Sequence, residues 1–296
     1  MSLRARILRM ALRAIARPMI ARTREPEVAR RRFLRTAKLL FRPPPLSLVL
    51  PVSHPSPGAW VQNRPSRGGV ILYFHGGAYV MGAPETHAAM LADLSRRTGV
   101  AAFLPRYRLA PEHPFPAAFD DALAAWDRLR ALGHEPTQIV LGGDSAGGGL
   151  ALALLGHLCR TGAAPAGAFA FSPWTDLTYS GPSLDENARR DALLPVERID
   201  EVRAMVLGAH QDRADDPRIS PLFAEFPDPP PVQIHVAQTE ILRDDSLRMQ
   251  DRLARADIRM ARDLPHVWPI FHNLLPEAGD TLDVTASFIR RCLDQN

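Results

Sequence analysis

Cysteine is scarce in this chain of 296 residues, which contains only Cys159 and Cys292. The two are far apart in sequence, and neither belongs to a spacing that metal ligands use. This scarcity excludes a disulfide-stapled scaffold and a cysteine-based zinc site, and it fits a reducing compartment. We therefore expect a cytoplasmic protein.

Long apolar runs are also lacking. After the N-terminal 45 residues, no stretch is long and apolar enough to span a bilayer. Acidic residues are rare at the N-terminal end, where residues 1–45 hold 13 Lys or Arg against 2 Asp or Glu, a net charge of about +11. The remainder carries about −7, because the whole chain carries +4. This balance argues against nucleic acid binding by the main body.

The basic N-terminal segment contains apolar residues at helical spacing, which predict one face of a helix that ends near Pro18: Leu3, Ile7, Leu8, Leu12, Ile15 and Met19. Three interpretations stay open for it. The favoured one is a cap helix over an active site. The others are a helix on an anionic membrane surface and a cleaved targeting segment, although arginines interrupt the unbroken apolar stretch that a secretory signal needs.

From residue 70 onward, strand and helix patterns alternate. Short apolar runs predict strands at 70–74, 100–104, 139–141, 168–171, 232–236 and 258–262. Longer stretches predict helices at 87–97, 119–132, 146–159, 246–256 and 278–292. The alternation predicts a parallel sheet with helices on both faces.

Two kinds of segment interrupt this rhythm. Prolines at 43–45 and between residues 55 and 65 predict breaks after the basic helices. The polar, helical interval at about 177–216 is interpreted as an insertion that completes a cap with the N-terminal helices. The expected division is 1–50 for the N-terminal cap helices, 51–176 and 223–296 for the two parts of the core, and 177–222 for the cap insertion.

Residues 143–147 read Gly-Asp-Ser-Ala-Gly, which has the form G-x-S-x-G, between a predicted strand and a predicted helix. A sharp strand-to-helix turn exposes a serine hydroxyl above the sheet edge, and small neighbours permit the strained backbone. The N-terminus of the following helix favours a developing negative charge. Ser145 is therefore the predicted nucleophile.

Residues 75–78 read His-Gly-Gly-Ala directly after the first predicted strand. When a serine attacks an ester carbonyl, the oxygen becomes negative, and backbone N–H groups must already point at it. Glycines let the backbone approach closely. We expect the N–H groups of Gly76, Gly77 and Ala146 to form the oxyanion hole.

Chain order narrows the choice of a base. At such a serine turn, the acid and then the histidine follow the nucleophile in the chain. Histidines before Ser145 are therefore disfavoured, and only His266 and His272 lie in the last loop region.

Several motifs together make the sequence similar to the hormone-sensitive-lipase-like esterases, called family IV among bacterial lipolytic enzymes. The matching segments are residues 75–78, 107–118, 143–148, 172–177 and 216–222. The resemblance covers about residues 70–280. One departure is Ala78, where the family usually has a third glycine.

The resemblance implies an α/β-hydrolase fold with a mostly parallel sheet and a two-part helical cap. It also implies carboxylic ester hydrolysis, with a preference for small-molecule esters of short acyl chains, and no metal or cofactor. A homodimer through the sheet edge near 258–262 and peripheral membrane contact through the basic N-terminus stay open. So do a non-catalytic ligand-binding protein and an amide or lactam hydrolase with the same residues.

The resemblance also assigns the remaining site residues. The loop at 264–268 looks like the family's histidine loop, which makes His266 the base and leaves His272 as the alternative. Glu240 stands where the family usually has the acid aspartate, and a glutamate can do the same work. Asp244 is the alternative acid, although it also suits the N-terminus of a helix.

Overall fold

The computed structural model describes residues 1–66, 68–253 and 255–294. Within them, eight strands form one sheet in the order β1-β2-β4-β3-β5-β6-β7-β8. Their bounds are β1 Leu48–Val52, β2 Gly58–Gln62, β3 Val70–Phe74, β4 Ala101–Pro105, β5 Ile139–Asp144, β6 Gly167–Phe171, β7 Val232–Ala237 and β8 Ala256–Ala261. Only β2 is antiparallel to its neighbours, β1 and β4, so the prediction of a mostly parallel sheet is confirmed.

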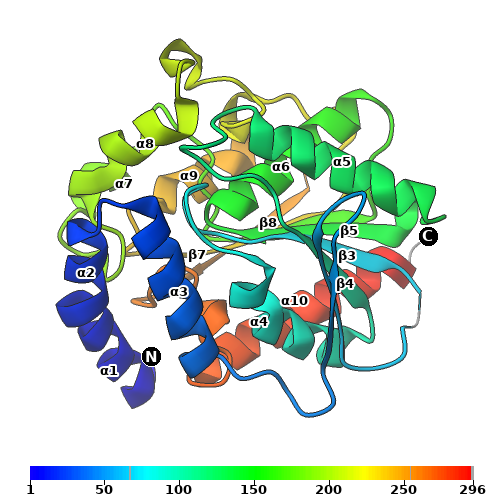
Figure 1. Ribbon diagram of the computed structural model, residues 1–296, viewed down its shortest axis with the longest axis horizontal. Helices are drawn as coiled ribbons and strands as arrows, with labels where there is room; N and C mark the ends of the chain where they lie inside the picture. The colour runs from blue at the N-terminus through cyan, green and yellow to red at the C-terminus, as the bar shows by residue number, and fades with distance from the viewer. Residues whose placement is uncertain (67, 254, 295–296) are drawn as a thin grey trace.

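Helices cover both faces of this sheet (Figure 1). On one face lie α5 (Ala117–Ala131), α6 (Ala146–Arg160) and α9 (Arg243–Arg248), and on the other lie α4 (Pro84–Thr98) and α10 (Pro276–Asp294). Alternate residues of a strand face opposite sides. Leu72 and Phe74 of β3 accordingly join the core under α5 and α6, whereas Ile71 and Tyr73 join the core under α4 and α10. The sheet is therefore buried on both faces.

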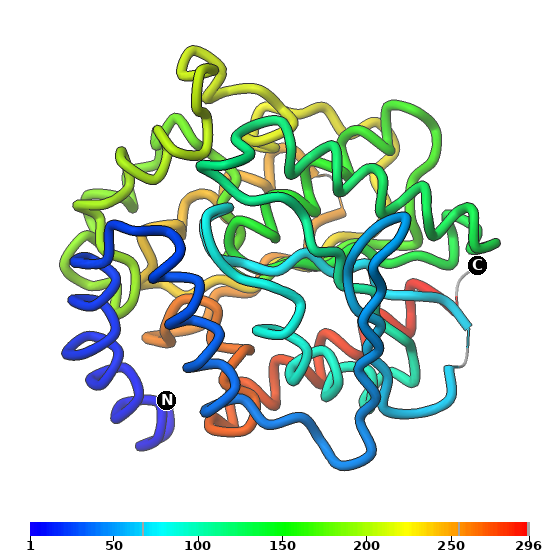
Figure 2. Tube along the Cα trace, in the orientation of Figure 1, coloured from blue at the N-terminus to red at the C-terminus, as the bar shows by residue number. Residues whose placement is uncertain are grey.

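A third group of helices lies beyond the carboxyl end of the sheet. It comprises α1 (Leu3–Ala11), a π-helical turn (Leu12–Ala16), α2 (Arg17–Arg22), α3 (Pro26–Leu40), α7 (Ser183–Glu186) and α8 (Ile199–Leu207). The N-terminal helices lie beside the segment between β6 and β7 (Figure 2). The Arg198 guanidinium joins the two by donating hydrogen bonds to the carbonyls of Ile20 and Thr23, at 3.0 and 2.8 Å. No helix in the described ranges combines the length and apolarity that crossing a bilayer requires.

The prediction that the first helix ends near Pro18 is wrong. The chain stays helical to Arg22, because Pro18 falls in the first turn of α2, where a backbone N–H needs no intrahelical partner. The π-helical turn before it also changes the phase of the apolar residues. Within α1, Leu8 packs inward whereas Leu3 and Ile7 are exposed, and in the turn Leu12 packs inward whereas Ile15 is exposed, so the apolar residues do not share one face.

Two further expectations need correction. Breaks were predicted at 43–45 and between 55 and 65; α3 does end at Leu40, but the second segment also contains β2, which pairs with β1, and Pro51 is tolerated because β1 is the edge strand. The predicted helix at 246–256 is displaced. It begins at Arg243 and gives way to a 3₁₀ turn that ends at Asp251, and Ala256 already starts β8. Residue 254 of that prediction lies outside the described residues.

Candidate active site

Ser145 lies on a tight turn between β5 and α6, with φ 52° and ψ −124°. Residues other than glycine rarely adopt such a backbone conformation. Close packing around the turn explains why glycines flank Ser145. A Cβ on Gly143 would lie 2.2 Å from the Gly147 carbonyl oxygen, and a Cβ on Gly147 would lie 2.1 Å from the Phe74 carbonyl oxygen. The turn therefore holds the Ser145 hydroxyl at the N-terminus of α6.

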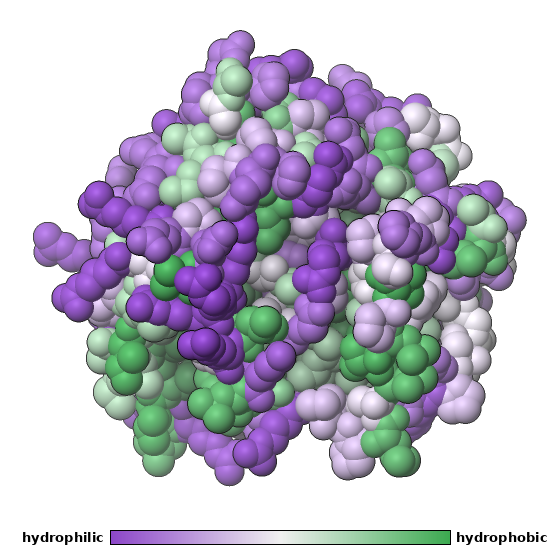
Figure 3. Space-filling model, in the orientation of Figure 1, coloured by the Kyte–Doolittle hydropathy of each residue, from purple (hydrophilic) through white to green (hydrophobic). Residues whose placement is uncertain are grey.

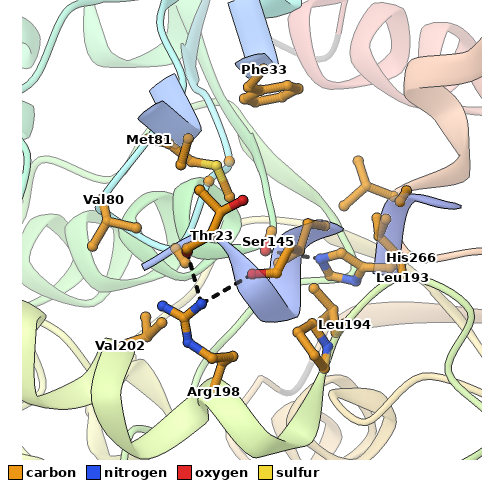
Figure 4. Close-up of a pocket in the computed structure, with 18 of the residues that line it drawn as sticks. Thr23, Phe33, Val80, Met81, Ser145, Leu193, Leu194, Arg198, Val202 and His266 are labelled. Carbon is orange, nitrogen blue, oxygen red and sulfur yellow. Dashed lines mark hydrogen bonds between the residues drawn. The ribbon is translucent and has the colours of Figure 1, made fainter. Parts of the chain in front are cut away.

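Two loops bring a histidine and a carboxylate to this hydroxyl. His266, in the loop after β8, has its Nε2 2.9 Å from Ser145 Oγ, and the two side chains face each other in Figure 4. Glu240, in the loop after β7, has Oε2 2.6 Å from His266 Nδ1. An ionised carboxylate only accepts, so the proton lies on Nδ1 and Nε2 is free to accept from the serine.

The carboxylate of Glu240 is fixed from its other side. Its Oε1 accepts hydrogen bonds from the Ser172 hydroxyl at 2.9 Å and from the Ala237 N–H at 2.6 Å. The Ser172 oxygen in turn accepts from the Val267 N–H, next to the histidine, at 3.2 Å. Ser172 thus connects the two loops. Sequence reasoning placed it in a family motif at 172–177 but gave it no role.

The charge of Glu240 raises the pKa of His266. Both side chains are almost fully buried, with 4% of His266 and 1% of Glu240 exposed. Burial by itself lowers the pKa of His266, but the charge of Glu240 and its hydrogen bond outweigh that effect, so the pKa is raised above 6.5. The arrangement therefore stabilises an imidazolium that forms when the histidine takes a proton.

In the loop after β3, one of the N–H groups that were expected to bind the oxyanion is already occupied. The Gly76 N–H already donates to Asp144 Oδ1 at 3.0 Å, so it is not free for a substrate oxygen. Tyr73 and His87 also bind the Asp144 carboxylate. Burial raises the pKa of Asp144, but the charge of His87 and the hydrogen bonds prevail and lower it, so the carboxylate stays ionised and holds the loop.

The next two N–H groups of this loop have no acceptor within the described ranges. They belong to Gly77 and Ala78, at φ 123° and 55°. The Ala146 N–H lies at the start of α6, where no intrahelical acceptor exists. These three donors flank Ser145, and sequence reasoning included two of them. Ala78 is the third, because the hydrogen bond from Gly76 to Asp144 moves the free donors one residue along the loop.

Ser145 and His266 line a cavity of about 330 Å³. Its other walls are mostly apolar and come from both cap segments, including Met19, Ile20 and Phe33 from the N-terminal helices and Leu194, Val202 and Met205 from the insertion. A serine hydroxyl bonded to an imidazole, with free N–H donors beside an apolar cavity, suits acyl transfer from an uncharged ester.

Comparison with known proteins identifies the family of this chain. Residues 71–270 match the family described as alpha/beta hydrolase fold. A crystal structure of an esterase from the bacterial hormone-sensitive lipase family superimposes with a TM-score of 0.91 at 32% identity, covering 99% of each chain. The chain belongs to the hormone-sensitive-lipase-like esterases.

Other members of this family are similar along much of the chain. An acetyl-hydrolase of Streptomyces hygroscopicus is 34% identical over 236 residues, which are 78% of each protein. The crystal structure of EstE5, soaked with p-nitrophenyl butyrate, superimposes with a TM-score of 0.91 at 35% identity, covering 99% of this chain and all of that one. The protein is a carboxylic ester hydrolase with the α/β-hydrolase fold, as the sequence motifs predict.

The alternative site residues of this esterase lie elsewhere. The His272 ring contacts the carbonyls of Ile270 and Arg42, both at 3.2 Å, and does not line the cavity. Asp244 accepts from the Ser183 N–H at 2.7 Å and pairs with Arg243. His272 and Asp244 therefore lie away from Ser145, whereas His266 contacts Ser145 and Glu240 contacts His266.

Proposed function

We propose that this esterase hydrolyses short-chain acyl esters with Ser145 as nucleophile, His266 as base and Glu240 as acid. One observation carries the proposal, namely the continuous chain of contacts from Glu240 Oε2 through both His266 nitrogens to Ser145 Oγ, at 2.6 and 2.9 Å. The relatives named esterase or acetyl-hydrolase support the reaction type.

The reaction follows from the protonation states. His266 Nε2 takes the Ser145 proton as Oγ attacks the ester carbonyl, and Glu240 stabilises the imidazolium. N–H groups of Gly77, Ala78 and Ala146 bind the oxyanion, in place of the Gly76 donor expected from sequence. The imidazolium protonates the leaving alcohol. His266 then deprotonates a water molecule, which attacks the acyl-enzyme and releases the acid.

The cavity sets the expected substrate size. Its volume of about 330 Å³ is at the lower end of the roughly 300–1,000 Å³ that ligand pockets span. We expect kcat/KM to be highest for p-nitrophenyl acetate or butyrate and to fall for the octanoate and palmitate. The measurement is a rate profile over these four esters below their critical micelle concentrations, and fastest turnover of palmitate would contradict the proposed preference.

The raised pKa of His266 predicts the pH dependence. The base must be neutral to accept the serine proton, so activity falls as pH drops through its pKa. We expect the acidic limb of kcat/KM to have its midpoint above pH 6.5. His272→Gln should leave this midpoint in place, because His272 is not in the relay. A midpoint at or below 6.5 would contradict the raised pKa of His266, and a midpoint that moves in the His272 variant would contradict the role of His266 as the base.

Quaternary structure stays a prediction. The strand expected to form a homodimer, β8, is indeed at the sheet edge, and Met260 on it is 53% exposed. An edge strand offers unpaired backbone groups to a second copy.

A further inference from the structure

We propose that residues 1–50 form a docking face for an anionic lipid bilayer. Twelve of the fifteen large apolar side chains that are exposed in the described ranges lie in these residues, and ten of the twelve remain for the outer surface because Met19 and Leu40 line the cavity. Most soluble proteins scatter such side chains singly, and their concentration in one segment marks an interaction surface. In Figure 3 apolar side chains gather at the lower left, over α1 and the end of α3, next to strongly hydrophilic ones.

The first helix is apolar on two sides. Its inward side, with Leu8 and Leu12, packs on the protein. Its outward side carries Leu3, Ile7 and Met10, which are 72%, 54% and 63% exposed. The spacing of four and three residues places these side chains in one outward stripe along the helix. Packing within the protein explains the first side but leaves the second without a partner.

The arginines of the N-terminal helices also form an inward and an outward group. Arg9, Arg13 and Arg17 recur every four residues and donate to the carbonyls of Arg190, Arg189 and Ala188, so they attach the helices to the insertion. Arg4 and Arg6 flank the outward stripe, are exposed and have no ion-pair partner among the described residues. No Asp or Glu occurs in residues 1–24.

The charge of the segment indicates which partner binds the outward stripe. Residues 1–45 carry about +11, and the cations among them that do not contact the insertion repel a second copy of the segment, whereas lipid phosphates and carboxylates attract them. An apolar stripe between arginines suits a helix that lies in the plane of a bilayer, with the stripe among the acyl chains and the guanidinium groups at the headgroups. The rest of the chain, at about −7, is repelled from the same surface, which orients the protein.

The proposed orientation places the bilayer on the outer surface of the cap. Leu12, Met19 and Ile20 of the same helical run line the cavity from its inner side. Docking by the outward stripe leaves these residues in place, so binding and hydrolysis of soluble esters are separable.

Vesicle co-sedimentation of the full chain tests the proposal. We expect binding to vesicles of phosphatidylcholine with phosphatidylglycerol, little binding to phosphatidylcholine alone, and release by high salt. The apolar variant Ile7→Ser/Met10→Ser and the charge variant Arg4→Glu/Arg6→Glu should each bind at least about tenfold more weakly. Both should hydrolyse p-nitrophenyl butyrate at the wild-type rate, which shows that they are folded.

Matched control variants carry the same kinds of substitution outside residues 1–50. Leu132→Ser/Met260→Ser removes side chains that are 51% and 53% exposed, and Arg160→Glu/Arg252→Glu reverses two exposed charges. These variants should bind like the wild type. Equal binding by wild-type and stripe variants, binding without phosphatidylglycerol, or a dimer that Ile7→Ser/Met10→Ser converts to a monomer without any vesicle binding would each overturn the proposal.

Discussion

Ser145→Ala is expected to lower kcat/KM for p-nitrophenyl butyrate on the order of 10⁴-fold or more, with thermal unfolding unchanged. Among the described residues the Ser145 hydroxyl has a hydrogen bond to the His266 ring alone, so its loss removes the nucleophile without leaving a buried donor of the core unpaired. Residual activity would come from the free N–H groups and the cavity alone. The measurements are steady-state rates and a thermal unfolding curve.

Covalent labelling by a fluorophosphonate distinguishes this role from a structural one. The wild type should be labelled in one-to-one stoichiometry and Ser145→Ala should not be labelled at all. Ser246→Ala is a suitable control, because Ser246 is buried and its Oγ has no partner in the described part of the chain. Wild-type turnover by Ser145→Ala would reject the assignment, and an unlabelled but folded wild type would favour a ligand-binding role for this chain.

The parts of the site that sequence could predict are those with a local cause. The glycine at 143 has such a cause, because a Cβ there would lie about 2 Å from the carbonyl oxygen of Gly147 in the same turn, whereas the glycine at 147 is required by Phe74 of the neighbouring strand β3. Buried strands such as β3 and β5 show as continuous apolar runs, because both of their faces are covered. Local sequence alone therefore indicates strand, turn and helix here.

Other features depend on long-range contacts that no local pattern reports. Gly76 was expected to bind the oxyanion, but Asp144, 68 positions away, takes its N–H. Ser172 becomes important only because β6 and β7 are adjacent, which brings its hydroxyl to Glu240. The N-terminal helices are likewise held by carbonyls of residues 188–190. Backbone acceptors have no sequence signature, so this packing was not predictable in detail.

Replacing Glu240 should be the second most damaging change. Glu240→Ala is expected to lower kcat/KM by roughly 10³- to 10⁴-fold, because the imidazolium and its Nδ1 proton lose the carboxylate that they contact. Glu240→Gln should be similarly impaired, since an amide keeps the size but cannot offset the positive charge. Glu240→Asp should retain more activity than either, because a carboxylate at a slightly greater distance still favours the imidazolium.

Asp244→Ala is the matched control, four positions along the chain in the first turn of α9. Asp244 pairs with Arg243 and accepts from the Ser183 N–H, so its loss should lower the melting temperature but leave kcat/KM of the folded fraction within about tenfold of wild type. Rates normalised to active-site titration separate the two effects. If Asp244→Ala is the worse lesion by that measure, the acid is not Glu240, and the contact of 2.6 Å to His266 would have to serve packing alone.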